Sequence, residues 1–291
     1  MFAEFLQYLI SGVTVGAIYG LVGLGFSIIF NSSQVINFAQ GEFVMIGGMA
    51  TVSLISAGIP MPLAMLGAVA ITTIIGVLIE KFCIEPSRNA PVVTLIIITI
   101  GASIFLRGMA EVIWDRNFHS LAPISGDTPI NIGGAMLLPQ SIWIVGSLVA
   151  VVIALWYFFN RTLMGKAMLA TSYNRLAAQL VGIQVRSILL LSFVLSSALG
   201  AFAGILIAPI AMTYSTVGIM LGLKGFSAAI VGGLGNPMGA IIGGLIVGIA
   251  EAMTAGYISS AYKDAVAFII ILGVLFFMPN GLFGQKMVEK V

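Results

Sequence analysis

Long apolar stretches separated by short polar breaks dominate this chain. A helix needs about 20 apolar residues to cross roughly 30 Å of hydrocarbon. The stretches closest to that length cover residues 8–30, 43–57, 63–79, 92–114, 141–159, 188–207 and 265–278, with a longer region at 217–257. The pattern therefore predicts an all-α fold, a polytopic transmembrane helical bundle of about eight membrane segments.

The Gly-rich region 217–257 is broken in its middle by GGLGNPMG at 232–239. Asn236-Pro237 is a turn signal, and a proline interrupts helical hydrogen bonding. Two interpretations stay open: two closely packed spans, or a broken, re-entrant segment followed by one span. Non-helical backbone at membrane depth requires cover by protein or a cavity.

Basic residues are concentrated in three of the breaks. Two lie between residues 80 and 91, four between 160 and 187, and two in the C-terminal tail (Lys81, Arg88, Arg161, Lys166, Arg175, Arg186, Lys286 and Lys290). Loops rich in Lys and Arg stay in the cytoplasm. We therefore expect the N-terminus outside, the C-terminus inside, and the long loop 115–140 outside.

Composition excludes several classes of protein. Hydrophobic residues make up 60% and charged residues 8%, against about 25% charged in soluble domains, so neither a soluble globule nor a disordered chain fits. The net charge of +2 is too small for a nucleic-acid binder. Residues 1–10 show no basic region or cleavage signal, so we expect the first stretch to remain as a membrane helix.

No enzymatic chemistry is visible along the chain. His119 is the sole histidine of the sequence and Cys83 the sole cysteine, which excludes HExxH motifs, sites with several histidines and an internal disulfide. The glycine spacing at 233–239 does not fit a dinucleotide fingerprint. We predict no catalytic residue, no metal and no cofactor, and we expect His119 to be solvated and Cys83 to be structural.

Glycines recur at intervals of four, which places them on one face of a helix. This spacing relates Gly12, Gly16 and Gly20, then Gly200 and Gly204, Gly235, Gly239 and Gly243, and Gly244 and Gly248. Such faces let helix backbones pack closely, or they let helices slide during a transport cycle. The sequence does not separate these two interpretations.

Few charged residues fall inside the apolar stretches. Arg107 and Glu111 are four apart, so we expect them to pair. Glu42 and Glu251 are functional candidates because intramembrane ionisable groups usually serve function, although Glu42 could instead stabilise a helix N-terminus. With so few buried charges, we expect an apolar transport pathway without a tight substrate site.

The segment 160–187 alternates between apolar and polar residues at helical spacing. It predicts two short amphipathic helices, broken near Ser172-Tyr173, with Gly182 as a C-terminal cap. Such helices lie on a membrane surface or insert an apolar ridge into the groove of a partner.

Three segments of the chain resemble a known family. GKAMLATSYNRLAAQLVGI (165–183) is similar to the cytoplasmic coupling segment of permease subunits of ATP-driven (ABC) importers, of the branched-chain amino-acid type and its first, LivH-like, permease. INFAQGEFVMIGG (36–48) and KGFSAAIVGGLGNPMGAIIGGLIVGIAE (224–251) resemble two further signatures of that family. The match runs in order over essentially the whole chain. Leu169 departs from it, because relatives commonly carry Arg at this position.

The resemblance implies a single permease domain, 1–291, in the bacterial inner membrane, moving branched-chain or other neutral amino acids by alternating access. The implied partners are a second homologous permease, two cytoplasmic ATP-binding subunits, which hydrolyse the ATP, and a periplasmic substrate-binding protein facing loop 115–140. The implied ATPase-docking residues lie in the coupling segment: Lys166, Met168, Arg175, Leu176, Leu180 and Gly182. The candidates for the substrate pathway lie in the other two signatures: Asn37, Gln40, Glu42 and Glu251.

Two other classes compete with this interpretation. A secondary, ion-coupled transporter usually carries polar groups at mid-membrane, and a small-solute channel needs a ring of polar or charged groups along its pore. Neither class accounts for the long amphipathic segment 160–187.

Overall fold

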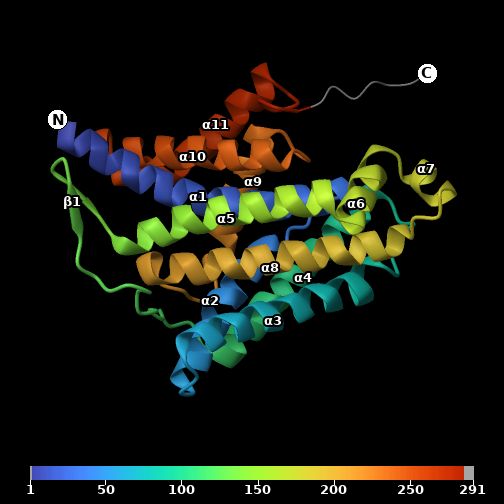
Figure 1. Cartoon of the computed structure of the whole chain (residues 1–291), viewed down its shortest axis with the longest axis horizontal. Helices are drawn as coiled ribbons and strands as arrows, with labels where there is room; N and C mark the ends of the chain where they lie inside the picture. The colour runs from blue at the N-terminus through green and yellow to red at the C-terminus, as the bar shows by residue number, and fades with distance from the viewer. Residues whose placement is uncertain (1, 285–291) are drawn as a thin grey trace.

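Helices make up nearly all of the regular structure in residues 2–284, which the computed structural model describes (Figure 1). Seven are long and apolar enough to cross a membrane: α1 (Phe2–Ser33), α3 (Met61–Ile79) continued by the π-helix η1 (Glu80–Ile84), α4 (Val92–Trp114), α5 (Pro139–Arg161), α8 (Val185–Ala211), α10 (Pro237–Tyr257), and η2 (Ser260–Tyr262) with α11 (Lys263–Phe277). The predicted all-α, polytopic fold is confirmed.

Two shorter helices, α2 (Gln40–Ser56) and α9 (Val217–Gly232), complete the bundle within the described residues. Every residue of α2 from Gln40 to Thr51 is buried. It lies among α8, α3 and α9 in the centre of the molecule (Figure 1). A Cβ on Gly47 would lie 2.4 Å from the Cα of Ala201 in α8, so small residues allow this central position.

The glycine stripes are contact surfaces between helices. A Cβ on Gly16 of α1 would lie 2.8 Å from the carbonyl oxygen of Gly244 in α10, and one on Gly248 would lie 2.3 Å from the Cα of Gly16. Side chains other than hydrogen do not fit at these distances. The stripes therefore bring the backbones of α1 and α10 together, as the packing interpretation predicts.

The Gly-rich region forms a helical hairpin whose turn lies between Gly233 and Asn236. The Asn236 side chain accepts a hydrogen bond from the Gly239 N–H at 3.0 Å and caps α10. Gly235 in the turn contacts Asn31 near the end of α1, whereas Tyr257 packs on Tyr8 near its start. The hairpin thus returns to the end from which it started. Its first arm, α9, has 16 residues and spans about 24 Å, less than the hydrocarbon thickness.

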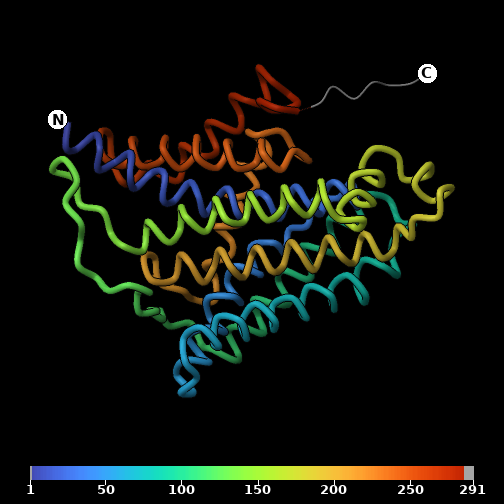
Figure 2. Tube along the Cα trace, viewed as in Figure 1, coloured from blue at the N-terminus to red at the C-terminus, as the bar shows by residue number. Residues whose placement is uncertain are grey.

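One end of the bundle carries the loop 115–138, which departs from the helical expectation. It contains an antiparallel hairpin of β1 (Ile130–Ile132) and β2 (Ala135–Leu137). Gln7 of α1 bonds both the N–H and the carbonyl of Met136, at 2.6 and 3.1 Å. Figure 2 shows the loop following the same end of the bundle as the N-terminus.

The prediction that His119 is solvated holds only in part, because 31% of its side chain is exposed. Its backbone pairs with that of Thr213, and its Nε2 lies 3.2 Å from the carbonyl oxygen of Trp114, so the residue is half-buried. Nearby, a hydrogen bond from the Asn117 N–H at 2.6 Å lowers the pKa of the exposed Asp115 carboxyl. These contacts fix the start of the loop on the bundle.

The opposite end carries α6 (Leu163–Tyr173), α7 (Arg175–Leu180) and the connection between η1 and α4. Arg186, at the start of α8, forms an ion pair with Glu85 in that connection. Two of the three basic segments therefore lie together, as the charge pattern predicts. Lys286 and Lys290 of the tail fall outside the described residues.

Candidate functional site

The segment 160–187 forms the two predicted short helices. Their break falls at Asn174, just after the predicted Ser172-Tyr173. Asn174 is extended, and its side chain accepts a hydrogen bond from the Ala177 N–H at 3.0 Å, which starts α7. Gly182, after α7, has a φ of 88°, a conformation that favours glycine. The capping residues thus set the turn between the helices and the exit into α8.

The two helices present an exposed apolar ridge at one end of the bundle. Leu176 is 73% exposed and Leu180 is 88% exposed, with Val181 beside them. Lys166 and Arg175 are exposed on the same segment. The short helix α7, which carries Leu176 and Leu180, lies beyond the ends of the long helices (Figure 1).

Met168 does not belong to this ridge. It is 3% exposed and packs in the main hydrophobic core with Ile188. Helical spacing places it on the same predicted apolar face as Leu163 and Met164, yet that face divides between core and solvent because α6 lies against α8 and α5. Its assignment as a docking contact is therefore wrong, because almost none of the Met168 surface is available to a partner.

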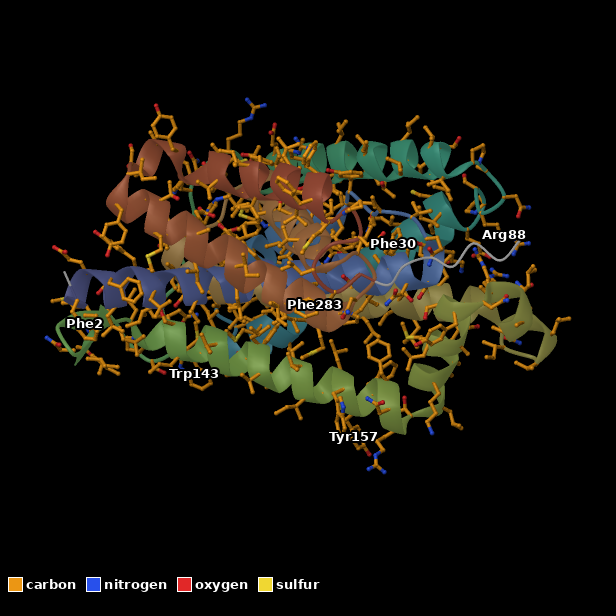
Figure 3. All side chains as sticks on the ribbon, turned by 90° about the horizontal axis from the view of Figure 1, so that it is seen from above. Phe2, Phe30, Arg88, Trp143, Tyr157 and Phe283 are labelled. Atoms are coloured by element: carbon orange, nitrogen blue, oxygen red, sulfur yellow. The ribbon has the colours of Figure 1, made fainter. Side chains whose placement is uncertain are left out.

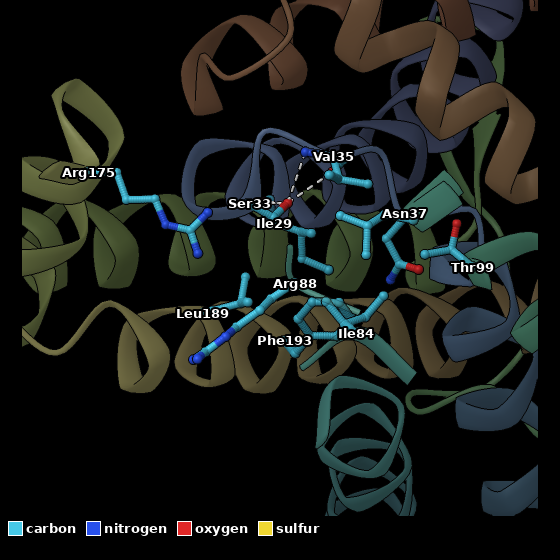
Figure 4. Close-up of a pocket in the computed structure, with 11 residues that line it drawn as sticks. Ile29, Ser33, Val35, Asn37, Ile84, Arg88, Thr99, Arg175, Leu189 and Phe193 are labelled. Atoms are coloured by element: carbon cyan, nitrogen blue, oxygen red, sulfur yellow. Dashed lines mark hydrogen bonds between the residues drawn. The ribbon is translucent and has the colours of Figure 1, made fainter. Parts of the chain in front are cut away.

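The four pathway candidates lie in different places. Asn37 lines a narrow slot of about 20 Å³, room for about one water molecule. Arg88 and Arg175 lie at one end of this slot, and Asn37 with Thr99 lies at the other (Figure 4). The slot is too small for an amino acid.

Gln40 occupies a packed position between α1 and α8. Its Nε2 donates to the carbonyl of Ser196 at 3.1 Å, and its Oε1 accepts from the Ser196 hydroxyl at 2.5 Å. A Cβ on Gly25 would lie 2.1 Å from Nε2. These contacts anchor the first turn of α2 against its neighbours.

Glu42 lines a larger cavity of about 140 Å³ between α1, α2, α4 and α9. It is 1% exposed, and its Oε1 accepts a hydrogen bond from the Ser103 hydroxyl at 2.8 Å. The Nε of Arg107 lies 3.5 Å from the same Oε1, and Nη2 of Arg107 donates to Ser103 at 3.3 Å. The remaining wall is mostly apolar and includes Phe26, Phe38, Ile100, Leu223 and Phe226.

The predicted pair between Arg107 and Glu111 is not formed. Glu111 instead accepts two hydrogen bonds from Arg116, at 2.6 and 3.0 Å. Arg107 lies beside the buried Glu42 of α2 because an unpaired buried carboxylate is costly. Sequence spacing along α4 does not reveal this partner on another helix.

A second charged cluster holds Glu251. Lys224 of α9 donates to Glu251 of α10 at 2.7 Å and to Asp264 of α11 at 2.6 Å. The Tyr19 hydroxyl of α1 donates to Glu251 at 2.8 Å. Buried charged residues are few in the described part of the chain, as expected (Glu42, Glu80, Lys224 and Glu251), but three of them lie in two clusters of charged groups. The groups of this second cluster bond one another and link four helices.

The outer surface is apolar, with aromatic residues near the ends of α5. Trp143 and Tyr157 point away from the bundle (Figure 3) and are exposed. Such residues are enriched at membrane interfaces. With the seven spanning helices, these features define the class: a polytopic α-helical membrane protein, with an internal cavity that contains a carboxylate and a guanidinium.

Comparison with known proteins gives the family. The family profile described as "Branched-chain amino acid transport system / permease component" matches residues 8–275. The chain is 35% identical over 315 residues to the high-affinity branched-chain amino acid transport system permease protein LivH of Escherichia coli strain K12, covering 100% of this chain and 99% of LivH. It is 33% identical to BraD of Pseudomonas aeruginosa, covering 99% and 98%. The chain belongs to this family of permeases and is a transport protein rather than an enzyme.

A solved structure shares the fold. The complex described as "PsaBC from Streptococcus pneumoniae in complex with Fab" contains a chain that matches 96% of this one and 97% of its own length, with a TM-score of 0.53 and 19% identity. At this identity, the likeness supports the helical architecture alone.

Proposed function

We propose that this chain is one permease subunit of an ATP-driven importer that moves branched-chain or other neutral amino acids across the bacterial inner membrane. It pairs with a second, homologous permease and works by alternating access. Two cytoplasmic ATP-binding subunits hydrolyse ATP, and a periplasmic binding protein delivers the substrate. Family membership and the names of the full-length relatives support this proposal.

The exposed ridge of α7 is the observation that carries the proposal furthest. Leu176 and Leu180 are large, apolar and mostly exposed at the end of the bundle. A basic segment at this end favours a cytoplasmic location, where a partner's groove would cover the ridge. We propose that Leu176 and Leu180 are the main ATPase contacts, with Lys166 and Arg175 at the rim and Gly182 shaping the exit. This orientation places the N-terminus outside and the C-terminus inside.

The cavity beside Glu42 is our proposed part of the substrate pathway. It combines a carboxylate and a guanidinium with apolar walls near the central helix α2. Asn37 and Gln40 lie close to Glu42 in the sequence, and we propose that they support the first turn of α2. Glu251 contributes to helix packing.

Removing the ridge tests the docking role. The double variant Leu176→Ala/Leu180→Ala should lose most of its co-purification with the ATP-binding subunits, because each interface anchor contributes about 2 kcal/mol or more, roughly 30-fold in affinity. ATP-driven uptake in vesicles should fall in parallel. The matched control Val149→Ala/Ile153→Ala removes two exposed apolar residues at the same spacing on α5 and should retain both. Normal association and uptake in the ridge variant would contradict the docking role.

A further inference from the structure

The cavity beside Glu42 contains three kinds of surface. Glu42 supplies a buried carboxylate, and Arg107, whose side chain is about a quarter exposed, supplies a guanidinium. Three phenylalanine rings from α1, α9 and the connection before α2 supply apolar walls. The rings of Phe38 and Phe226 have their centroids 5.7 Å apart. A neutral amino acid presents the complementary groups, namely an ammonium, a carboxylate and an apolar side chain.

The carboxylate and the guanidinium do not saturate each other. Their closest approach is 3.5 Å, whereas a charge-assisted hydrogen bond measures about 2.7–2.9 Å. Oε2 of Glu42 is buried and makes no hydrogen bond among the described residues, and neither does Nε of Arg107. Since buried polar groups are nearly always hydrogen-bonded, both groups retain capacity for a further partner.

The backbone of α9 packs closely against the Glu42 carboxylate. Gly218 and Gly222 of α9 line the same cavity, and a Cβ on Gly218 would lie 2.9 Å from Oε2 of Glu42. Any side chain at this position would press on the carboxylate. Small residues on α9 therefore allow this close packing, and the cavity that Glu42 lines has space for several water molecules.

We propose that this cavity is a transient binding site for a zwitterionic neutral amino acid: Glu42 receives the α-ammonium, Arg107 receives the α-carboxylate, and the phenylalanines contact the side chain. The inference rests on the proposed function, which makes neutral amino acids the cargo. It adds polar recognition to a pathway that the sequence predicts to be apolar. Ser103, bonded to both charged groups, is a positioning residue that holds them in register.

Protection from a thiol reagent tests recognition directly. A cysteine replaces Ile219, a partly buried residue lining the cavity, in a Cys83→Ser background. Millimolar L-leucine should slow maleimide labelling several-fold. 4-Methylpentanoate lacks the ammonium and 3-methylbutylamine lacks the carboxylate, so neither should protect. Equal protection by all three compounds, or protection that survives Glu42→Gln, would overturn the site.

Uptake by the reconstituted complex provides a second, independent test. Glu42→Gln and Arg107→Gln should each reduce ATP-driven leucine uptake at least tenfold at saturating loaded binding protein. The ion pair between Glu111 of α4 and Arg116, just beyond the end of that helix, is the control, and Glu111→Gln/Arg116→Gln should leave uptake unchanged. Full uptake in Glu42→Gln would overturn the proposal even if the cysteine at 219 proved unreactive.

The double variant Glu42→Gln/Arg107→Gln separates binding from mere structure. Removing both members of a buried ion pair leaves no stranded charge, so the melting temperature should recover relative to either single variant. If the pair binds substrate, uptake should stay low despite this recovery, whereas recovery of both would show a structural pair only. Absence of ATP-dependent uptake in the unmodified complex would instead count against the proposed function, and the labelling test would still decide the site.

Discussion

Lys224 lies where α1, α9, α10 and α11 meet, and its ammonium group contacts two carboxylates. It is 5% exposed, and it bonds Glu251 and Asp264 while its Nζ lies 5.4 Å from the centre of the Tyr19 ring. A buried ion pair adds little net stability compared with apolar packing, but losing one partner strands the other charge. We therefore assign Lys224 a role in holding the last three helices in register.

Lys224→Met should destabilise the protein by about 3–5 kcal/mol, because Glu251 would remain buried without a counter-charge. Thermal unfolding of the purified protein in detergent measures the effect. Lys263→Met, at an exposed position nearby, should change the melting temperature little. Equal melting temperatures for these two variants would contradict the role of Lys224.

The pairing of charges is the part of the site that sequence reasoning predicts least well. Arg107 and Glu111 have the spacing of a helical pair, but such a pair contributes only about 0.5 kcal/mol. Desolvation of the buried Glu42 costs more free energy than this pair contributes. Arg107 of α4 therefore lies beside Glu42 of α2 rather than beside Glu111. Glu42 itself could be chosen from sequence because a charge in an apolar stretch is conspicuous.

At the scale of elements, the apolar pattern of the sequence predicts the positions of the long helices well. The apolar stretch 92–114 coincides with α4, and other predicted spans end within several residues of the observed helices. Sequence does not show that α2 is enclosed, because lipid-facing and buried helices in a membrane are both apolar. The β1–β2 hairpin was missed, although Gly133-Gly134 between two short apolar runs is a recognised hairpin signal, and both glycines have positive φ.

Replacing a glycine in the close contact between α1 and α10 with a larger residue should disrupt the packing of these two helices. Gly244→Val would place atoms on the backbone of Gly20, where even a Cβ would lie 2.3 Å from its nitrogen. We expect a large loss of folded, monodisperse protein in size-exclusion chromatography. Gly146→Val on α5 is the matched control, since its Cβ would meet nothing within 4 Å. A yield for Gly244→Val equal to that of the control would contradict the packing account.

The two ends of the whole molecule differ in chemistry. One carries the hairpin loop and the start of α1, and the other carries the basic helices α6 and α7. The proposed orientation exposes the first to the periplasm and the second to ATP-binding partners. Because the α9–α10 hairpin returns to the end from which it starts, the proposed orientation places the start of α1 and the end of α11 on opposite sides of the membrane.

Single cysteines at Thr128 and Gln179, both exposed, test this orientation in a Cys83→Ser background. In intact cells with a permeable outer membrane, an impermeant maleimide should label position 128 and not position 179. In inverted inner-membrane vesicles, the labelling should reverse. Labelling of both positions from one side would contradict the proposed topology.

ATP-driven uptake by the assembled transporter tests the central claim most directly. The chain is purified with its candidate second permease, ATP-binding subunits and binding protein, and the complex is reconstituted in proteoliposomes. The measurement is the uptake of labelled leucine into these vesicles. We predict that uptake requires ATP, the binding protein and this chain, and that a sodium or proton gradient alone does not support it. Gradient-driven uptake without ATP, or uptake by this chain alone, would contradict the account.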